Sequence, residues 1–194
     1  RADFMVGTVA RSGPRSLAVG DVNGDGNLDI VTANHWNEYG SNSVSVLLGQ
    51  GNGEFLHFTD LSTLRGPFGV TLNDLNRDGR LDILITNHLA ESISVFWGDE
   101  DGTFATRSDF LTTYVPVGIA VGDLDGDGNL DVITGNGPGT IATLFGSPDG
   151  SLDGRRQFLT GTGPRSVSLG DLNADGNLDI VTANMWPDYG ANSV

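Results

Sequence analysis

The chain has 194 residues, 38% of them hydrophobic, which suffices for one sizeable core or one compact repeat array. Its formal net charge of −15 argues against a nucleic-acid partner, since nucleic acids attract basic surfaces, and no apolar run is long enough for membrane insertion. Cysteine and lysine are both absent, which excludes disulfides, thiol catalysis and Schiff-base chemistry.

One acidic motif returns four times along the chain. The sequence "DVNGDGNLD" at 21–29 reappears as "DLNRDGRLD" at 74–82, "DLDGDGNLD" at 123–131 and "DLNADGNLD" at 171–179. A proline stands seven residues before each copy, at Pro14, Pro67, Pro116 and Pro164. A fixed period of about 50 residues is the signature of a repeat architecture.

Each repeat unit predicts four short strands. In the first unit they are the segment between Pro14 and the acidic motif, then 28–34, 43–49 and 55–61. The same succession follows at 81–87, 92–98 and 104–111, and again at 130–136, 140–146 and 155–161. These runs are rich in Val, Ile, Leu, Thr and Phe, are bounded by turn residues, and lack a helical period. We therefore expect an all-β fold: a β-propeller of four-stranded antiparallel blades, with about four repeats of about 50 residues.

We expect a single β-propeller domain over residues 1–194. Residues 1–12 resemble the fourth strands and would belong to a closing blade. Whole blades are expected at 13–64, 65–113 and 114–160, and a partial blade at 161–194. Because the last unit stops before its third strand, one expectation is an incomplete ring or a fragment of a longer array. The other is a small four-bladed ring whose closing blade is shortened or is completed between chains in an oligomer.

Each acidic motif carries the spacing of a calcium loop. Oxygen-bearing side chains occupy positions 1, 3, 5 and 9, glycine at position 6 permits a sharp bend, and the carbonyl of position 7 adds a backbone oxygen. We therefore predict about four Ca²⁺ ions per chain. The predicted side-chain ligands are Asp21, Asn23, Asp25, Asp29, Asp74, Asn76, Asp78, Asp82, Asp123, Asp125, Asp127, Asp131, Asp171, Asn173, Asp175 and Asp179, with the backbone carbonyls of Asn27, Arg80, Asn129 and Asn177.

Two other interpretations of the acidic motifs are weaker. An EF-hand needs a glutamate at position 12, where this chain has Thr32, Ile85, Thr134 and Thr182, and its exiting helix would fall on a β-prone segment. Clusters of Asp, Asn and Gly also form ordinary turns. Three or four carboxylates within nine residues, repeated four times in register, would repel one another without a cation.

The motif D-x-[DN]-x-D-G-x-x-D within a four-strand unit, followed by "VSVLLGQGNGEF", resembles the FG-GAP/VCBS repeat family. That family includes the β-propeller of integrin α subunits and many secreted bacterial proteins. The resemblance covers essentially the whole chain and implies Ca²⁺ loops that link the first and second strands of each blade. Only "GPFG" at 66–69 is close to the integrin-type "FG…GAP" strings, so the bacterial VCBS type is the nearer resemblance.

The face opposite the calcium loops is the expected ligand face. It is formed by the connections between second and third strands and between fourth and first strands, and two of these are long, at 34–42 and 184–192. Aromatic rings beside Asn, Asp and Arg suit sugar rings or a protein partner, although they can also anchor loops between blades. The candidates are Trp36, Tyr39, Trp186, Tyr189, Arg15 and Arg165.

These expectations define a calcium-stabilised β-propeller at an extracellular or cell-surface location, because free Ca²⁺ is abundant outside cells. It would act as a recognition, adhesion or scaffold module that binds a glycan or a protein. No catalytic residue is predicted, so the expected module is not an enzyme. The alternative is part of a Ca²⁺-dependent polysaccharide-active enzyme such as a lyase, because some of these resemble this repeat architecture. A third hypothesis is a structural segment of a large adhesin without a ligand of its own.

Overall fold

The computed structural model describes residues 13–35, 42–100 and 102–185, apart from the side chain of His57. The strand expected at 1–12 and four candidates for the ligand face, Trp36, Tyr39, Trp186 and Tyr189, lie outside these residues. Within the described ranges the chain is built from strands, turns and bends, without a helix.

The described strands form three four-stranded sheets and one two-stranded sheet. The first sheet contains β1 (Gly13–Gly20), β2 (Asp29–His35), β3 (Ser43–Gly49) and β4 (Phe55–Ser62). The second contains β5 (Pro67–Asn73), β6 (Asp82–Asn87), β7 (Ser92–Trp97) and β8 (Thr106–Leu111). The third contains β9 (Pro116–Gly122), β10 (Asp131–Asn136), β11 (Thr140–Gly146) and β12 (Leu152–Leu159), and the fourth β13 (Pro164–Gly170) and β14 (Asp179–Asn184).

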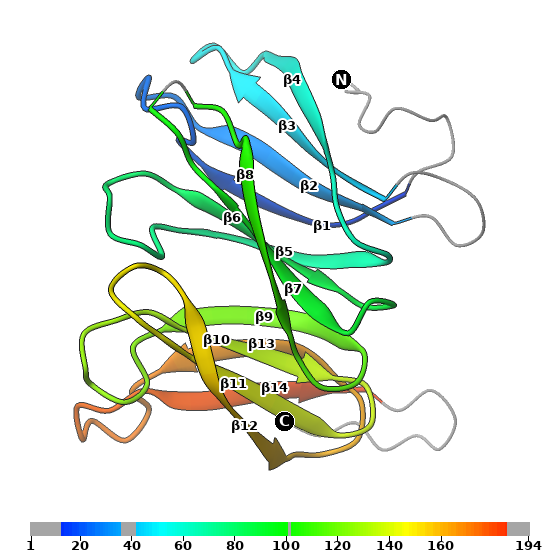
Figure 1. The fold of residues 1–194 in the computed structure, drawn as a ribbon, viewed down its shortest axis with the longest axis vertical. Helices are drawn as coiled ribbons and strands as arrows, with labels where there is room; N and C mark the ends of the chain where they lie inside the picture. The colour runs from blue at the N-terminus through cyan, green and yellow to red at the C-terminus, as the bar shows by residue number, and fades with distance from the viewer. Residues whose placement is uncertain (1–12, 36–41, 101, 186–194) are drawn as a thin grey trace.

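Each sheet is an antiparallel meander whose strands follow one another in chain order. The sheets are stacked so that β1 lies against β5, β5 against β9 and β9 against β13 (Figure 1). The first strand of every sheet is therefore the innermost one. Four-stranded meanders in this arrangement are the blades of a β-propeller. The structure thus confirms the predicted all-β propeller, and the described sheets form an open array of blades rather than a closed barrel.

The hydrophobic core consists of layers between neighbouring sheets. Val31 and Val44 of the first sheet pack with Ile83 and Ile85 of the second, and all four side chains are fully buried. Leu84 and neighbouring residues on the other face of the second sheet pack against the third sheet. Because a middle strand is covered on both faces, its residues are buried without alternation, as in β6. Burial of each such side chain contributes about 1.5–3 kcal/mol to the free energy of folding.

Small residues let the innermost strands approach one another. A Cβ atom at Gly69 on β5 would lie 2.5 Å from the carbonyl oxygen of Val117 on β9. A Cβ atom at Gly118 would lie 3.0 Å from the carbonyl oxygen of Arg165 on β13. Irregular pairing follows the proline of β1, β5 and β13, between Pro14 and Ser16 in the first of these. The axis of the array is therefore narrow at this level.

Polar side chains are buried near the strand ends opposite the acidic loops. Asn34 at the end of β2 donates from Nδ2 to the hydroxyl oxygen of Ser45 at 2.7 Å, and the Ser45 hydroxyl donates to Asp60 on β4. The second sheet repeats this chain of contacts with Asn87, Ser94 and Asp109. These bonds satisfy polar groups that would otherwise be costly to bury, and they tie three strands of a blade together.

Candidate metal centres and the axial pocket

The four acidic loops join the first and second strands of their sheets, as the resemblance implied. In the first loop, Asp21 Oδ1 accepts the N–H of Gly24 and Oδ2 accepts the N–H of Gly26, both at 2.8 Å. The first aspartates of the other loops accept the N–H of position 6 in the same way, at 2.8–2.9 Å, in the pairs Asp74–Gly79, Asp123–Gly128 and Asp171–Gly176. The loop backbone therefore wraps around the carboxylate of its first residue.

Position 6 of each loop requires glycine. Its φ angle is 87° at Gly26 and lies between 88° and 90° in the other three loops. Residues with a Cβ atom rarely adopt this conformation. The residue at position 4 also has a positive φ angle in all four loops. It is glycine in two loops, and it is Arg77 or Ala174, each with φ of 60°, in the other two.

The aspartate at position 9 fastens the loop to the rest of its blade. Asp29 is fully buried at the start of β2, and its two carboxylate oxygens accept the N–H of Val22 at 2.9 Å and of Gly49 at 2.8 Å. Asp82 and Asp131 make the equivalent pairs of bonds, Asp82 with Leu75 and Gly98, and Asp131 with Leu124 and Gly146, at 2.8–2.9 Å. In the last loop Asp179 accepts the N–H of Leu172 at 2.9 Å.

The glycine that ends the third strand belongs to this arrangement, although it lies outside the predicted calcium motif. A Cβ atom at Gly146 would lie 2.1 Å from the carbonyl oxygen of Leu130, and one at Gly49 equally close to that of Leu28. Only glycine therefore lets the third strand present its N–H to the aspartate. The recurrent glycine of "VLLG", "VFWG" and "TLFG" was the available signal.

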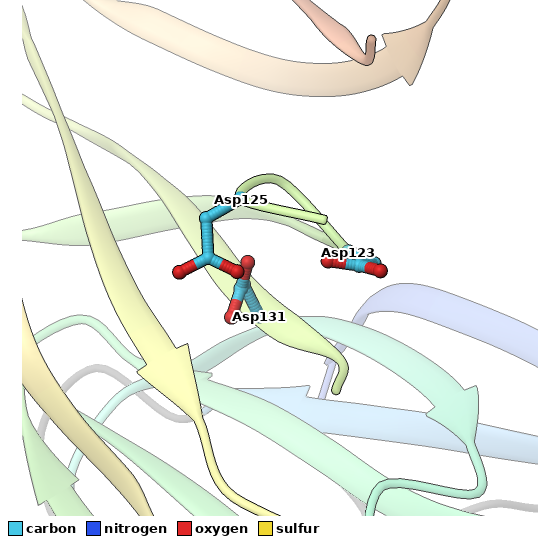
Figure 2. Close-up of side chains that lie close together, drawn as sticks. All are labelled: Asp123, Asp125 and Asp131. Atoms are coloured by element: carbon cyan, nitrogen blue, oxygen red, sulfur yellow. The ribbon is translucent and has the colours of Figure 1, made fainter. Parts of the chain in front are cut away.

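Three carboxylates meet in the third loop. One oxygen each of Asp123, Asp125 and Asp131 lie within 4.8 Å of one another (Figure 2). Asp123 and Asp125 extend from the loop, while Asp131 stands at the start of β10 and is buried. Hard oxygen donors at this separation suit a divalent cation such as Ca²⁺. In the other loops the third position is Asn23, Asn76 or Asn173, so an amide replaces one of these carboxylates.

The electrostatics of the position-9 carboxylates favour a cation nearby. Burial raises the pKa of Asp82 to about 6, the N–H groups of Gly98 and Leu75 partly counter this, and the charges of Asp78 and Asp74 raise it further. Burial likewise raises the pKa of Asp131, and the charges of Asp125 and Asp127 add to this effect. A positive ion would relieve both the burial cost and the repulsion. The residues present therefore fit the metal that the repeats imply.

The fifth position behaves differently from the other predicted side-chain ligands. Asp127 does not belong to the group of three carboxylates in the third loop. It is exposed and accepts the N–H of Asn129 at 2.7 Å, which together with the Asn129 side chain holds its pKa below the usual value. Asp25 and Asp175 are held in the same way, chiefly by the N–H groups of Asn27 and Asn177. The predicted ligation by position-5 side chains and position-7 carbonyls stays a prediction.

Arg15 and Arg165 come together at the other end of the first strands. They line one pocket of about 210 Å³, in which β1 and β13 contribute the arginines with Ser16 and Ser166, while β5 and β9 contribute 68–70 and 117–119. We call it the axial pocket, because all four innermost strands reach it. The guanidinium of Arg15 lies over the Phe68 ring at 5.9 Å from its centroid, and the ring stacks on His88.

The fold and the repeated loops define a class of protein: a repeat protein of antiparallel four-stranded blades with an acidic hairpin loop in each blade. The model of the FG-GAP-like repeat family matches three times, at residues 21–85, 74–134 and 125–182. The matches cover most of the chain, which therefore belongs to the FG-GAP-like repeat family.

Among solved structures, the chain is similar to the crystal structure of the V. cholerae biofilm matrix protein Bap1. The two share 21% sequence identity with a TM-score of 0.52, and the alignment covers 89% of this chain and 28% of Bap1. At this identity the similarity concerns the fold, and the chain spans less than a third of the length of Bap1. No curated protein sequence matches. The described residues contain no helix of the length and apolarity needed to cross a membrane.

Proposed function

We propose that this chain is a Ca²⁺-stabilised β-propeller module of the VCBS type, with the blade limits expected from the sequence. It serves extracellular or cell-surface adhesion or matrix assembly and binds a glycan or a protein through the face opposite its metal loops. The convergence of Asp123, Asp125 and Asp131 carries the metal part of this proposal. Membership of the FG-GAP-like repeat family supports the module, and the fold shared with a biofilm matrix protein is consistent with the extracellular role.

When bound, Ca²⁺ would neutralise carboxylates that the fold brings together. In the third loop Asp123, Asp125 and Asp131 would hold it, and in the other loops the residues at the same positions. The chain's own residues prepare these places, because the position-9 aspartate is fixed between the loop and the third strand by two N–H groups. The metal would therefore stabilise the connection between three strands of a blade, and its role would be architectural.

Metal removal tests the calcium proposal. Ligands that bind only the native state stabilise it by mass action, by about 2.7 kcal/mol at a concentration 100 times Kd. We expect EDTA to lower the Tm clearly and added Ca²⁺ to restore it, with about four Ca²⁺ bound per chain in a calorimetric titration. Identical melting curves with EDTA and with Ca²⁺ would contradict the proposal. Mg²⁺ at the same concentration is the matched control, because it accepts fewer protein ligands.

A further inference from the structure

The axial pocket is a positively charged site in an acidic protein. The chain carries 25 acidic and 10 basic residues, yet Arg15 and Arg165, from the first and last described sheets, line this one pocket. Neither arginine forms an ion pair with a described acidic residue, whereas Arg80 and Arg107 both do. Among the described residues, therefore, no acidic side chain neutralises these two guanidinium groups at the axis of the propeller.

Two histidines lie beside the pocket, next to Phe68. His88 stacks on Phe68 at 5.9 Å, and His35 meets His88 edge to face at 6.4 Å. Burial lowers the pKa of His88, and the charges of His35, Arg165 and Arg15 lower it further, so both arginines act on this point. Nδ1 of His88 is buried with no hydrogen-bond partner among the described residues. An anion bound here would complement the two guanidinium groups and would favour the protonated form of His88.

The shape of the pocket selects the kind of anion. Its volume of about 210 Å³ lies below the range of roughly 300–1,000 Å³ of ordinary small-molecule sites, so it fits one ring or one side chain. The backbone of Gly69 and Val117 is already engaged there, because Gly69 donates its N–H to Thr86 Oγ1 at 2.8 Å and the Thr86 hydroxyl donates to the carbonyl oxygen of Val117 at 3.0 Å. At Gly69 β5 lies close to β9, and at Gly118 β9 lies close to β13. No further peptide strand therefore fits between these innermost strands. Sugar hydroxyls, which donate and accept hydrogen bonds, match the hydroxyls of Ser16 and Ser166 in the pocket lining.

We propose that the axial pocket binds a carboxylate-bearing sugar residue, a uronate, with Arg15 and Arg165 holding the carboxylate. The inference rests on the recognition role proposed above and gives it a ligand class. Arginine is suited to this task, because its planar guanidinium forms two parallel hydrogen bonds with a carboxylate. The same site would discriminate against neutral sugars, which cannot form charge-assisted hydrogen bonds with the two guanidinium groups.

Calorimetric titration of the whole chain with sodium glucuronate and sodium galacturonate tests the proposal. The buffer contains saturating Ca²⁺ and little other salt, since exposed charges are screened at high ionic strength. We expect saturable binding of at least one uronate, and binding of the corresponding neutral sugars at least about 10-fold weaker. Arg15→Gln and Arg165→Gln should each weaken uronate binding about 10- to 100-fold. Arg156→Gln, on the outermost strand β12, is the matched control and should bind like the wild type.

A second readout detects the anion without relying on affinity. An anion beside His88 favours the imidazolium form, so its pKa measured by NMR should rise when uronate is added. His57, on the outermost strand β4, serves as an internal reference. Absence of uronate binding, or binding by Arg15→Gln and Arg165→Gln that is as tight as that of the wild type, would overturn the proposal. Binding of an acetylated glutamate amide in preference to both uronates would assign the pocket to an acidic protein partner instead. Failure here with an intact Ca²⁺ effect on Tm would leave the calcium proposal standing.

Discussion

The fourth position of the acidic loops shows how one residue limits stability. Ala174 adopts φ of 60°, a conformation in which Gly24 and Gly126 stand in the equivalent loops. A non-glycine residue in this region is strained by about 1–2 kcal/mol. Glycine avoids this strain, but its greater conformational freedom in the unfolded chain offsets part of the gain in stability. We expect Ala174→Gly to raise the free energy of unfolding by about 0.5–1 kcal/mol in urea denaturation. Gly176→Ala, with φ of 88°, should lower it, and a stabilised Gly176→Ala protein would contradict this account.

Asp82 predicts a pH dependence of the calcium-free protein. Its pKa is about 6 in the folded state against an ordinary 3.8, so the folded protein binds this proton more readily than the unfolded chain. Stability contributed by Asp82 is therefore present below about pH 4 and lost as the pH rises through 6, a change of at most about 3 kcal/mol. Asn resembles the protonated carboxyl, so Asp82→Asn should flatten the difference in unfolding free energy between pH 5 and pH 7. Chemical denaturation in calcium-free buffer measures this difference. An equal pH dependence of the unfolding free energy in the wild type and in Asp82→Asn would refute the role of Asp82.

At the scale of the element, the acidic loop and the end of the third strand form one structure. Gly146 donates its N–H to Asp131 at 2.8 Å, and a Cβ atom there would meet the Leu130 carbonyl. Gly146→Ala should therefore lower the free energy of unfolding by about 2–4 kcal/mol and weaken Ca²⁺ binding at one site. Gly170→Ala is the matched control, because its Cβ atom would meet nothing closer than 4.0 Å. Calorimetry with and without Ca²⁺ checks both effects, and a Gly146→Ala protein as stable as this control would disprove the coupling.

The strands and their blades could be predicted because turn chemistry recurs at fixed distances. Pro67, the acidic loop and the β-branched run "DILIT" mark the first two strands of the second blade without knowledge of any distant contact. The bonds of Asp82 to Gly98 and the burial of Asn34 depend on strands brought together by the fold, so the sequence pattern did not reveal them. Arg15 and Arg165 were predicted on one face, but their shared pocket with Phe68 follows from the stacking of four blades.

At the scale of the whole molecule, the metal loops belong to different blades, and each blade packs on its neighbours. In such arrays stability is approximately a sum of repeat and interface terms, so the loss of one site should remove only its own share. We expect Asp25→Ala to lower the Tm in Ca²⁺ by less than EDTA lowers that of the wild type, since three loops keep all their predicted side-chain ligands. In EDTA the two proteins should melt almost together, because the exposed Asp25 side chain would then stabilise little beyond the loop itself. Scanning calorimetry of both proteins in both buffers gives four Tm values. Together they separate the metal-dependent part of the Tm change caused by Asp25→Ala from the part that does not depend on metal. A deficit of Asp25→Ala that persists undiminished in EDTA would assign Asp25 to the shape of the loop alone.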